Sequence, residues 1–164
     1  AHVRSVCDEW AAAVGADATP ELHLHAADVL AEFDREHLRR VIVNLLDNAR
    51  RYANVGPGHI QVHTRALPAG AGGFEIEVWS DGAALDPSVE QHLFEPFFSS
   101  QSRSTGLGLF ICRELCERHG ASIAYQRSER RMEGARQPRI GNAFVIRSRA
   151  PAPAAELPAD TIVV

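Results

Sequence analysis

The sequence predicts an α+β domain in which a mixed β-sheet of about four or five strands carries its helices on one face. Two observations indicate this class. Segments with the alternating pattern of strands are interleaved with segments of helical periodicity, and turns rich in glycine or proline separate them. The 164 residues are 45% hydrophobic and 23% charged, which is ordinary for a soluble domain with one core.

The first half of the chain predicts two helices and a strand between them. Residues 3–14 have helical periodicity that ends at Gly15, and residues 21–25 alternate as a short strand. A longer helix is expected over residues 34–52, with Asp34 as a suitable N-cap. Its apolar stripe consists of Leu38, Val41, Ile42, Leu45 and Ala49.

The second half predicts a hairpin, a helix and two more strands. Residues 59–65 and 74–79 should pair as a hairpin, because the glycine-rich stretch AGAGG joins them. A helix is expected over about 108–119, with Gly120 as its C-cap. The remaining strands are expected at residues 121–126 and 142–147.

Charge and composition exclude several classes of function. The net charge of −4 provides no surface for nucleic acid, and no apolar run approaches the roughly 20 residues that cross a bilayer. Cys7, Cys112 and Cys116 form no disulfide framework and fit a reducing, cytoplasmic setting. Cys112, Cys116 and His119 would share a helix face, so a metal site stays open beside the simpler interpretation of packed, inert thiols.

Two asparagines interrupt the long helix at the border of its apolar stripe. The border residues, at i, i+4, i+7 and i+8, are Asn44, Asn48, Arg51 and Tyr52. Asparagine has poor helix propensity, but a carboxamide oxygen can bind Mg²⁺ without adding charge, and a nearby arginine can hold a phosphate. The alternative is that the asparagines bond to neighbouring loops and the arginine is solvated.

The helix expected at 108–119 begins in a glycine-rich turn. Gly106 and Gly108 flank Leu107 where backbone N–H groups lack partners and the helix dipole is positive. Phosphate binds well to such a helix start, and the polar run 99–104, which includes Arg103, could close over it. The alternative is a tight loop that simply leads into a helix.

In order along the chain, three segments resemble motifs of the catalytic and ATP-binding domain of sensor histidine kinases. They are NLLDNARRY (44–52), HLFEPFFSS (92–100) and STGLGLFICREL (104–115), and GNAFVIRS (141–148) resembles the closing strand. These kinases belong to a wider ATPase group that includes gyrase, Hsp90 and MutL. The short polar run is similar to that of nitrogen-regulation and type IV pilus sensor kinases. The resemblance implies a two-layer α/β sandwich, the Bergerat ATP-binding fold.

The resemblance also implies roles for the matching positions. Asn48 would ligate the Mg²⁺ that bridges the ATP phosphates, Asn44 would support that end of the site, and Arg51 would stand near the phosphates. Tyr52 would lie against the adenine. The phosphate-side helix mouth would consist of Thr105, Gly106, Leu107, Gly108 and Leu109, and the hinge of the lid of Phe94, Pro96, Phe97 and Phe98. ATP-hydrolysing relatives carry a glutamate at position 44, and because an asparagine is a poor general base, transfer to a protein histidine is favoured over hydrolysis.

One motif of the family, Asp-x-Gly-x-Gly, is incomplete in VWSDGAALDP (78–87). If Gly82 is its first glycine, Ser80 stands at the position of the aspartate that accepts a hydrogen bond from adenine, and Ala84 replaces the second glycine. A hydroxyl is a weaker acceptor by roughly 1–2 kcal/mol, about 5- to 30-fold in affinity, so weak nucleotide binding is expected. Asp81 would point the other way unless a bulge returns it to the site.

The resemblance divides the chain into three parts. Residues 1–19 would be a helical lead-in from an acceptor domain, 20–148 the catalytic and ATP-binding domain, and 149–164 a Pro/Ala-rich disordered tail. None of the eight histidines lies in a dimerising helical hairpin, so the acceptor histidine would lie on another domain of the parent chain, which would then serve a response regulator. The isolated chain would be a cytoplasmic monomer without phosphotransfer of its own, from a parent with or without an inner-membrane anchor.

Two functions from different classes remain. The first is an enzyme domain that binds Mg²⁺-ATP and presents the γ-phosphate to a histidine by positioning and charge neutralisation. The second is a degenerate module that keeps the fold, binds nucleotide weakly or not at all and acts by binding a partner protein. Ser80 and Ala84 favour the second function, and the ordered motifs favour the first.

Overall fold

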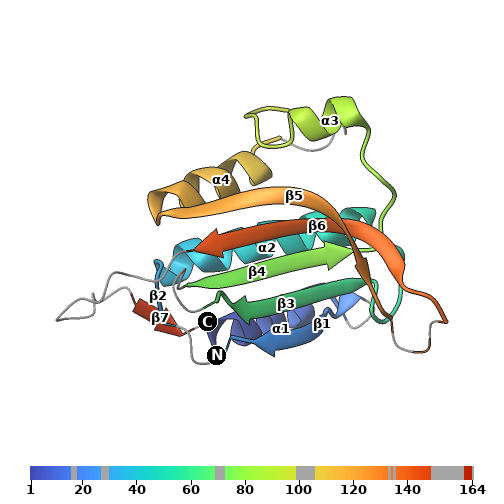
Figure 1. Ribbon diagram of the computed structural model, residues 1–164, viewed down its shortest axis with the longest axis horizontal. Helices are drawn as coiled ribbons and strands as arrows, with labels where there is room; N and C mark the ends of the chain where they lie inside the picture. The colour runs from blue at the N-terminus through green and yellow to red at the C-terminus, as the bar shows by residue number, and fades with distance from the viewer. Residues whose placement is uncertain are drawn as a thin grey trace.

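The computed structural model describes residues 1–15, 18–26, 30–68, 73–98, 106–132, 134, 136–148 and 161–163. A mixed five-stranded sheet is covered on one face by helices (Figure 1), which confirms the predicted α+β class. The helices are α1 (His2–Val14), α2 (Arg35–Tyr52), α3 (Pro87–Gln91) and α4 (Gly108–Arg118). The strands are β1 (Glu21–His25), β2 (Leu30–Glu32), β3 (Ile60–Ala66), β4 (Phe74–Ser80), β5 (Ala121–Arg130), β6 (Arg139–Ser148) and β7 (Thr161–Val163).

The main sheet has the strand order β1-β3-β4-β6-β5. Strand β1 runs parallel to β3, and the other neighbours are antiparallel. The predicted hairpin is confirmed as the β3–β4 pair. None of the helices in the described part of the chain is long and apolar enough to cross a bilayer.

Helix α2 is the centre of the helical layer, and local sequence determines where it begins. The Asp34 carboxylate accepts a hydrogen bond of 2.8 Å from the backbone N–H of His37, which confirms the predicted N-cap. The predicted apolar stripe is buried against the sheet. Because burying apolar surface is the main favourable term in folding, this stripe anchors α2 and sets which side chains border it.

Strand β4 is buried on both faces, and its two faces differ in chemistry. Phe74, Ile76 and Val78 belong to the core under the helices, whereas Trp79 lies in a separate cluster with strand β6. Because side chains alternate along a strand, Ser80 continues the row that faces the helices. The next residue continues the opposite row.

The face of the sheet opposite the helices carries paired charges. The Glu75 carboxylate accepts hydrogen bonds of 2.7 Å from Arg65 Nε and of 2.7 Å from Arg147 Nε. On the same face Glu77 pairs with Arg130. Buried carboxylates are stable in such a place only when they are paired and hydrogen-bonded.

Helix α1 confirms the helix expected in the first residues, and it packs into the same core as α2. Its buried side chains are Val3, Val6, Cys7 and Trp10. Trp10 Nε1 donates a hydrogen bond of 2.8 Å to Asp47 of α2, and Arg39 of α2 pairs with Glu9 at 2.8 Å. Helix α1 is therefore held against α2 by both apolar packing and polar contacts.

Strands β5 and β6 are longer than predicted and bend together across the end of the sheet (Figure 1). Their outer halves, around residues 127–130 and 139–141, lack the apolar alternation that marks a strand. A contact to the rest of the sheet holds the outer half of β5 in place, because Trp79 Nε1 of β4 donates a hydrogen bond of 2.9 Å to the Ser128 carbonyl.

The expectation of a disordered tail over residues 149–164 is wrong at one point. Residues 161–163 form β7, which pairs antiparallel with β2, so that Leu30 lies opposite Val163. The partner strand lies more than a hundred positions earlier in the sequence, so no local pattern marks the pairing. Residues 149–160 lie outside the described part of the chain.

Candidate functional site

The asparagine stripe of α2 faces helix α4. Asn44 lies close to the Cys112 thiol of α4, which donates a hydrogen bond of 3.8 Å to the Val41 carbonyl of α2. Asp47, by contrast, bonds to α1, so the two flanks of α2 are distinct. At about 100° per residue, Asn48 lies one turn beyond Asn44 on the flank away from Asp47. The half-buried Asn48 amide has no hydrogen-bond partner among the described residues.

The last turn of α2 meets the loop that follows β4. A Cβ atom at Gly82 would lie 2.8 Å from the Tyr52 carbonyl oxygen and 3.0 Å from Asn142 Nδ2. No other residue type fits there, because real Cβ atoms do not approach other atoms so closely. Gly82 thus brings the end of β4 against the end of the asparagine stripe. Arg51 lies exposed on the same turn.

Side chains of β5 and β6 hold the loop after β4 in place. Asn142 Nδ2 donates 2.9 Å to the Ala83 carbonyl, and Arg127 Nη1 donates 3.1 Å to the Gly82 carbonyl. The Asn142 Oδ1 atom accepts from Tyr125 Oη and from Arg127, each at 2.8 Å. These residues were not predicted from the sequence, although an asparagine next to the apolar part of a strand is an uncommon choice that indicates a specific role.

Ser80 and Asp81 point to opposite faces of the sheet. Ser80 is buried and lies in regular register between Ile60 and Asn142, so no bulge interrupts the strand. Its side chain therefore shares the helix-covered face with Ile60. Asp81 continues the opposite row and does not join the asparagines.

The Asp81 carboxylate is fully engaged within the protein, and its side chain is 1% exposed. Oδ1 accepts from the Asn54 backbone N–H at 3.0 Å, and Oδ2 accepts from Asn54 Nδ2 at 3.0 Å, His59 Nδ1 at 2.5 Å and Arg139 Nη1 at 2.9 Å. Burial alone would raise the pKa of this carboxyl, but the hydrogen bonds from Asn54 and His59 outweigh it and hold the pKa below its ordinary value.

The two ends of the polar run meet where α4 begins. A Cβ at Gly106, whose φ is +67°, would lie 2.6 Å from the Phe97 carbonyl carbon and from the Phe98 oxygen. Phe97 itself is 79% exposed with φ +61°, and Phe94 packs edge-on against Phe144. The backbone of Phe97 and Phe98 is thus in direct contact with the backbone of Gly106. Arg103 and Thr105 lie outside the described residues.

No side chain among the described residues caps the N-terminus of α4. Leu107 is its N-cap and provides no side-chain hydrogen bond. A Cβ at Gly108 would meet nothing within 4 Å among the described residues. Leu109 is half-buried and packs on the core. Unpartnered N–H groups at a helix start suit an anion such as phosphate.

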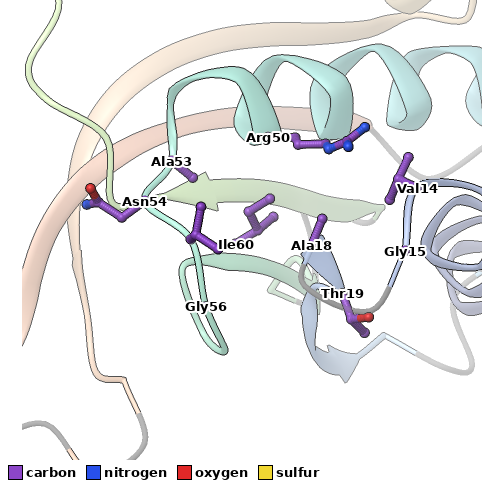
Figure 2. Close-up of a pocket in the computed structure, with 10 residues that line it drawn as sticks. Val14, Gly15, Ala18, Thr19, Arg50, Ala53, Asn54, Gly56 and Ile60 are labelled. Carbon is purple, nitrogen blue, oxygen red and sulfur yellow. The ribbon is translucent and has the colours of Figure 1, made fainter.

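A cavity of about 290 Å³ lies on the other flank of α2, as Figure 2 shows. Arg50 and Ala53 of α2 line it together with Val14 and Ala18 from the region of α1. The asparagines of the stripe do not line this cavity. It is therefore separate from the arrangement formed by Asn48, Gly82 and the start of α4.

The cysteines fit the interpretation of packed thiols. Cys112 and Cys116 are fully buried, and burial raises the pKa of each to about 12. His119 contacts His37 at 2.9 Å between ring nitrogens and stacks on Phe33. Among the residues with described side chains, no group of three His, Cys, Asp or Glu is arranged to hold a metal ion.

Comparison with known proteins identifies relatives of the whole arrangement. The family model described as histidine kinase-, DNA gyrase B-, and HSP90-like ATPase matches residues 33–151. The sensor protein kinase PilS of Pseudomonas aeruginosa is 35% identical over 123 residues, which are 74% of this chain and 23% of PilS. The sensor protein KdpD of Escherichia coli is 34% identical over 105 residues, 61% of this chain and 11% of KdpD. The chain therefore spans less than a quarter of these relatives.

Solved structures have the same fold. The catalytic domain of histidine kinase ThkA superposes with a TM-score of 0.70 at 22% identity, covering 91% of this chain and 90% of that one. The mycobacterial sensor histidine kinase MprB superposes with a TM-score of 0.65 at 22% identity, covering 91% of this chain and 95% of the MprB chain. The two-layer sandwich implied by the sequence motifs is thus confirmed.

Proposed function

Because the chain belongs to the family of histidine kinase-, DNA gyrase B- and HSP90-like ATPases, we propose that it is the ATP-binding catalytic domain of a two-component sensor histidine kinase. Its named relatives are sensor kinases, which supports this choice within the family. The domain donates the γ-phosphate of ATP to a histidine on a separate dimerisation domain of its parent chain, and a response regulator receives the phosphate next. It acts on the cytoplasmic side.

The observation that carries this proposal is the half-buried Asn48 amide on the flank of α2 that faces α4. Because no described residue forms a hydrogen bond with this amide, its oxygen is available to a ligand that enters beside α4. Neutral amide oxygens together with phosphate oxygens form a donor set that suits Mg²⁺. The residues present therefore fit a Mg²⁺-nucleotide, with Asn48 as the protein ligand of the metal.

The chain's own residues would then position the nucleotide. The Gly106–Gly108 turn donates backbone N–H groups to the phosphates, with support from Arg51 and from Arg103 and Thr105 in the lid. Tyr52, Ser80 and Gly82 border the base. The bound Mg²⁺ supplies neutralisation of phosphate charge during transfer.

The Asn44 side chain favours transfer over hydrolysis. It lies between α2 and α4, close to the Cys112 thiol. A neutral amide cannot take a proton from water, so it does not promote hydrolysis of the γ-phosphate, which remains available for transfer to the histidine. The geometry around position 44 therefore serves a kinase rather than a water-activating ATPase.

A titration of the purified chain with Mg²⁺-ATP tests the proposal. Binding should weaken about 10-fold or more in Asn48→Ala, which corresponds to about 1.4 kcal/mol. Arg51→Ala should also weaken binding, whereas its neighbour Arg50→Ala should not, because Arg50 lines the separate cavity on the α1 flank. Equal effects of the two arginine variants would contradict the assignment.

A second candidate is the degenerate, non-catalytic module that acts by binding a partner protein. The specific observation in its favour is that the Asp81 carboxylate is engaged elsewhere, so that only the Ser80 hydroxyl is left at the base end. No binding of Mg²⁺-ATP at millimolar concentration by the wild-type chain would favour this candidate over the kinase.

A further inference from the structure

The end of β4 determines which polar groups a purine base would meet. Ser80 shares the helix-covered face with Ile60 and Asn142, its neighbours across the ladder. Gly82, two positions on, lies against the last turn of α2. The groups that approach this corner from the sheet are therefore the Ser80 hydroxyl and the Asn142 amide.

The Asn142 amide already forms hydrogen bonds within the protein. Its Oδ1 atom accepts hydrogen bonds from Tyr125 and Arg127, and its Nδ2 atom donates to the Ala83 carbonyl. Turning the amide toward a ligand would release the loop that these bonds hold. Asn142 therefore supports the corner without reading the base.

The Asp81 carboxylate does not reach this corner. It lies on the opposite face of the sheet, and three side chains from separate segments, Asn54, His59 and Arg139, donate to it. Rotating it into the site would leave these donors without their acceptor. The Ser80 hydroxyl, for which the described residues offer no hydrogen-bond partner, is left as the polar group that meets the base.

A hydroxyl and a carboxylate discriminate bases differently. An ionised carboxylate only accepts, so it pairs with the 6-amino group of adenine and is repelled by a 6-oxo group. A hydroxyl both donates and accepts, so it can bond to either group. Sites that bond a ligand through a group of fixed polarity reject the wrong analogue strongly, and sites without such a group do not.

We propose that this domain discriminates little at the 6-position of the purine, so that 6-oxopurine nucleoside triphosphates bind nearly as well as ATP. Ser80 is the residue that determines this specificity, and the engagement of Asp81 by Asn54, His59 and Arg139 prevents a carboxylate from taking its place. The inference rests on the proposed nucleotide site and names its substrate class.

The test compares ATP with inosine triphosphate, which carries a 6-oxo group and lacks the extra amino group of guanine. Dissociation constants are measured with Mg²⁺ for the wild-type chain by calorimetry. We expect the two constants to differ by less than 10-fold. A difference of 10-fold or more in favour of ATP would overturn the inference and leave the proposed function intact. No binding of either nucleotide would overturn both, beginning with the proposed function.

Variants test the assignment to Ser80. Ser80→Asp should raise the preference for ATP to about 10-fold or more, because it introduces an acceptor of fixed polarity. Ser80→Ala should weaken both nucleotides to the same extent and keep their ratio. Asp81→Asn should also keep the ratio, and a change of the ratio in this variant would show that Asp81 reads the base. The wild-type ratio decides the inference even if Ser80→Asp fails to fold.

Discussion

Replacing Asp81 by asparagine should lower the free energy of unfolding by about 2 kcal/mol, since one charge-assisted, buried hydrogen bond is worth roughly that much. The variant keeps an acceptor for the Asn54 backbone N–H but places an amide NH₂ where Oδ2 accepts three donors. The Arg139 side chain is 52% exposed, so water can replace its lost bond. The His59 side chain is only 16% exposed, so its contact sets most of the loss.

Urea unfolding of wild type and variant measures this loss, with the midpoint compared at a common slope. Glu75→Gln is the matched control, because Glu75 is also a buried carboxylate, lies near the start of the same strand β4 and pairs with arginines. Both arginines, Arg65 and Arg147, are well exposed and can be hydrated again. The control should therefore lose less than about 1 kcal/mol.

The result that refutes this reasoning is a loss in Asp81→Asn of no more than that of Glu75→Gln. It would mean that the bonds from Asn54, His59 and Arg139 do not hold the loop after β4. A coupling of about 1 kcal/mol between Asp81→Asn and His59→Gln in a double-mutant cycle would locate the stabilisation in that pair.

Two further predictions concern buried groups. Burial raises the pKa of Cys7, Cys112 and Cys116 to about 12. Ellman's reagent at pH 8 should therefore leave the folded chain unmodified and titrate three thiols once guanidinium has unfolded it. A thiol of the folded chain that reacts at the rate of free cysteine would contradict this. Burial, with a smaller effect of Arg130, lowers the pKa of His63 from 6.5 to about 4. As the pH falls, the imidazole is therefore protonated first in the unfolded chain, and the free energy of unfolding should decrease as the pH drops from 6.5 towards 4. His63→Gln should flatten this part of the urea midpoint against pH, and an unchanged slope would show that His63 does not contribute.

Local features were predictable from the sequence because each depends on residues close together in the chain. Asp34 caps α2 through a donor three positions on, and the apolar stripe of α2 follows from helical periodicity. The β3–β4 pairing follows from two strand-like segments and the turn between them. The ordered motifs placed Asn44 and Asn48 on α2 and glycines at the start of α4, in agreement with the family comparison.

The sequence by itself thus determined the fold class, the principal helices and the family of this protein. Only the tertiary structure decided that Asp81 is engaged while Ser80 faces the helices, because the partners of Asp81 lie 22 to 58 positions away in the sequence. The same holds for the packing of α1 on α2 and for the pairing of β7 with β2. Such contacts follow from side chains that meet only after the chain has collapsed, and no local pattern records which of them will be neighbours.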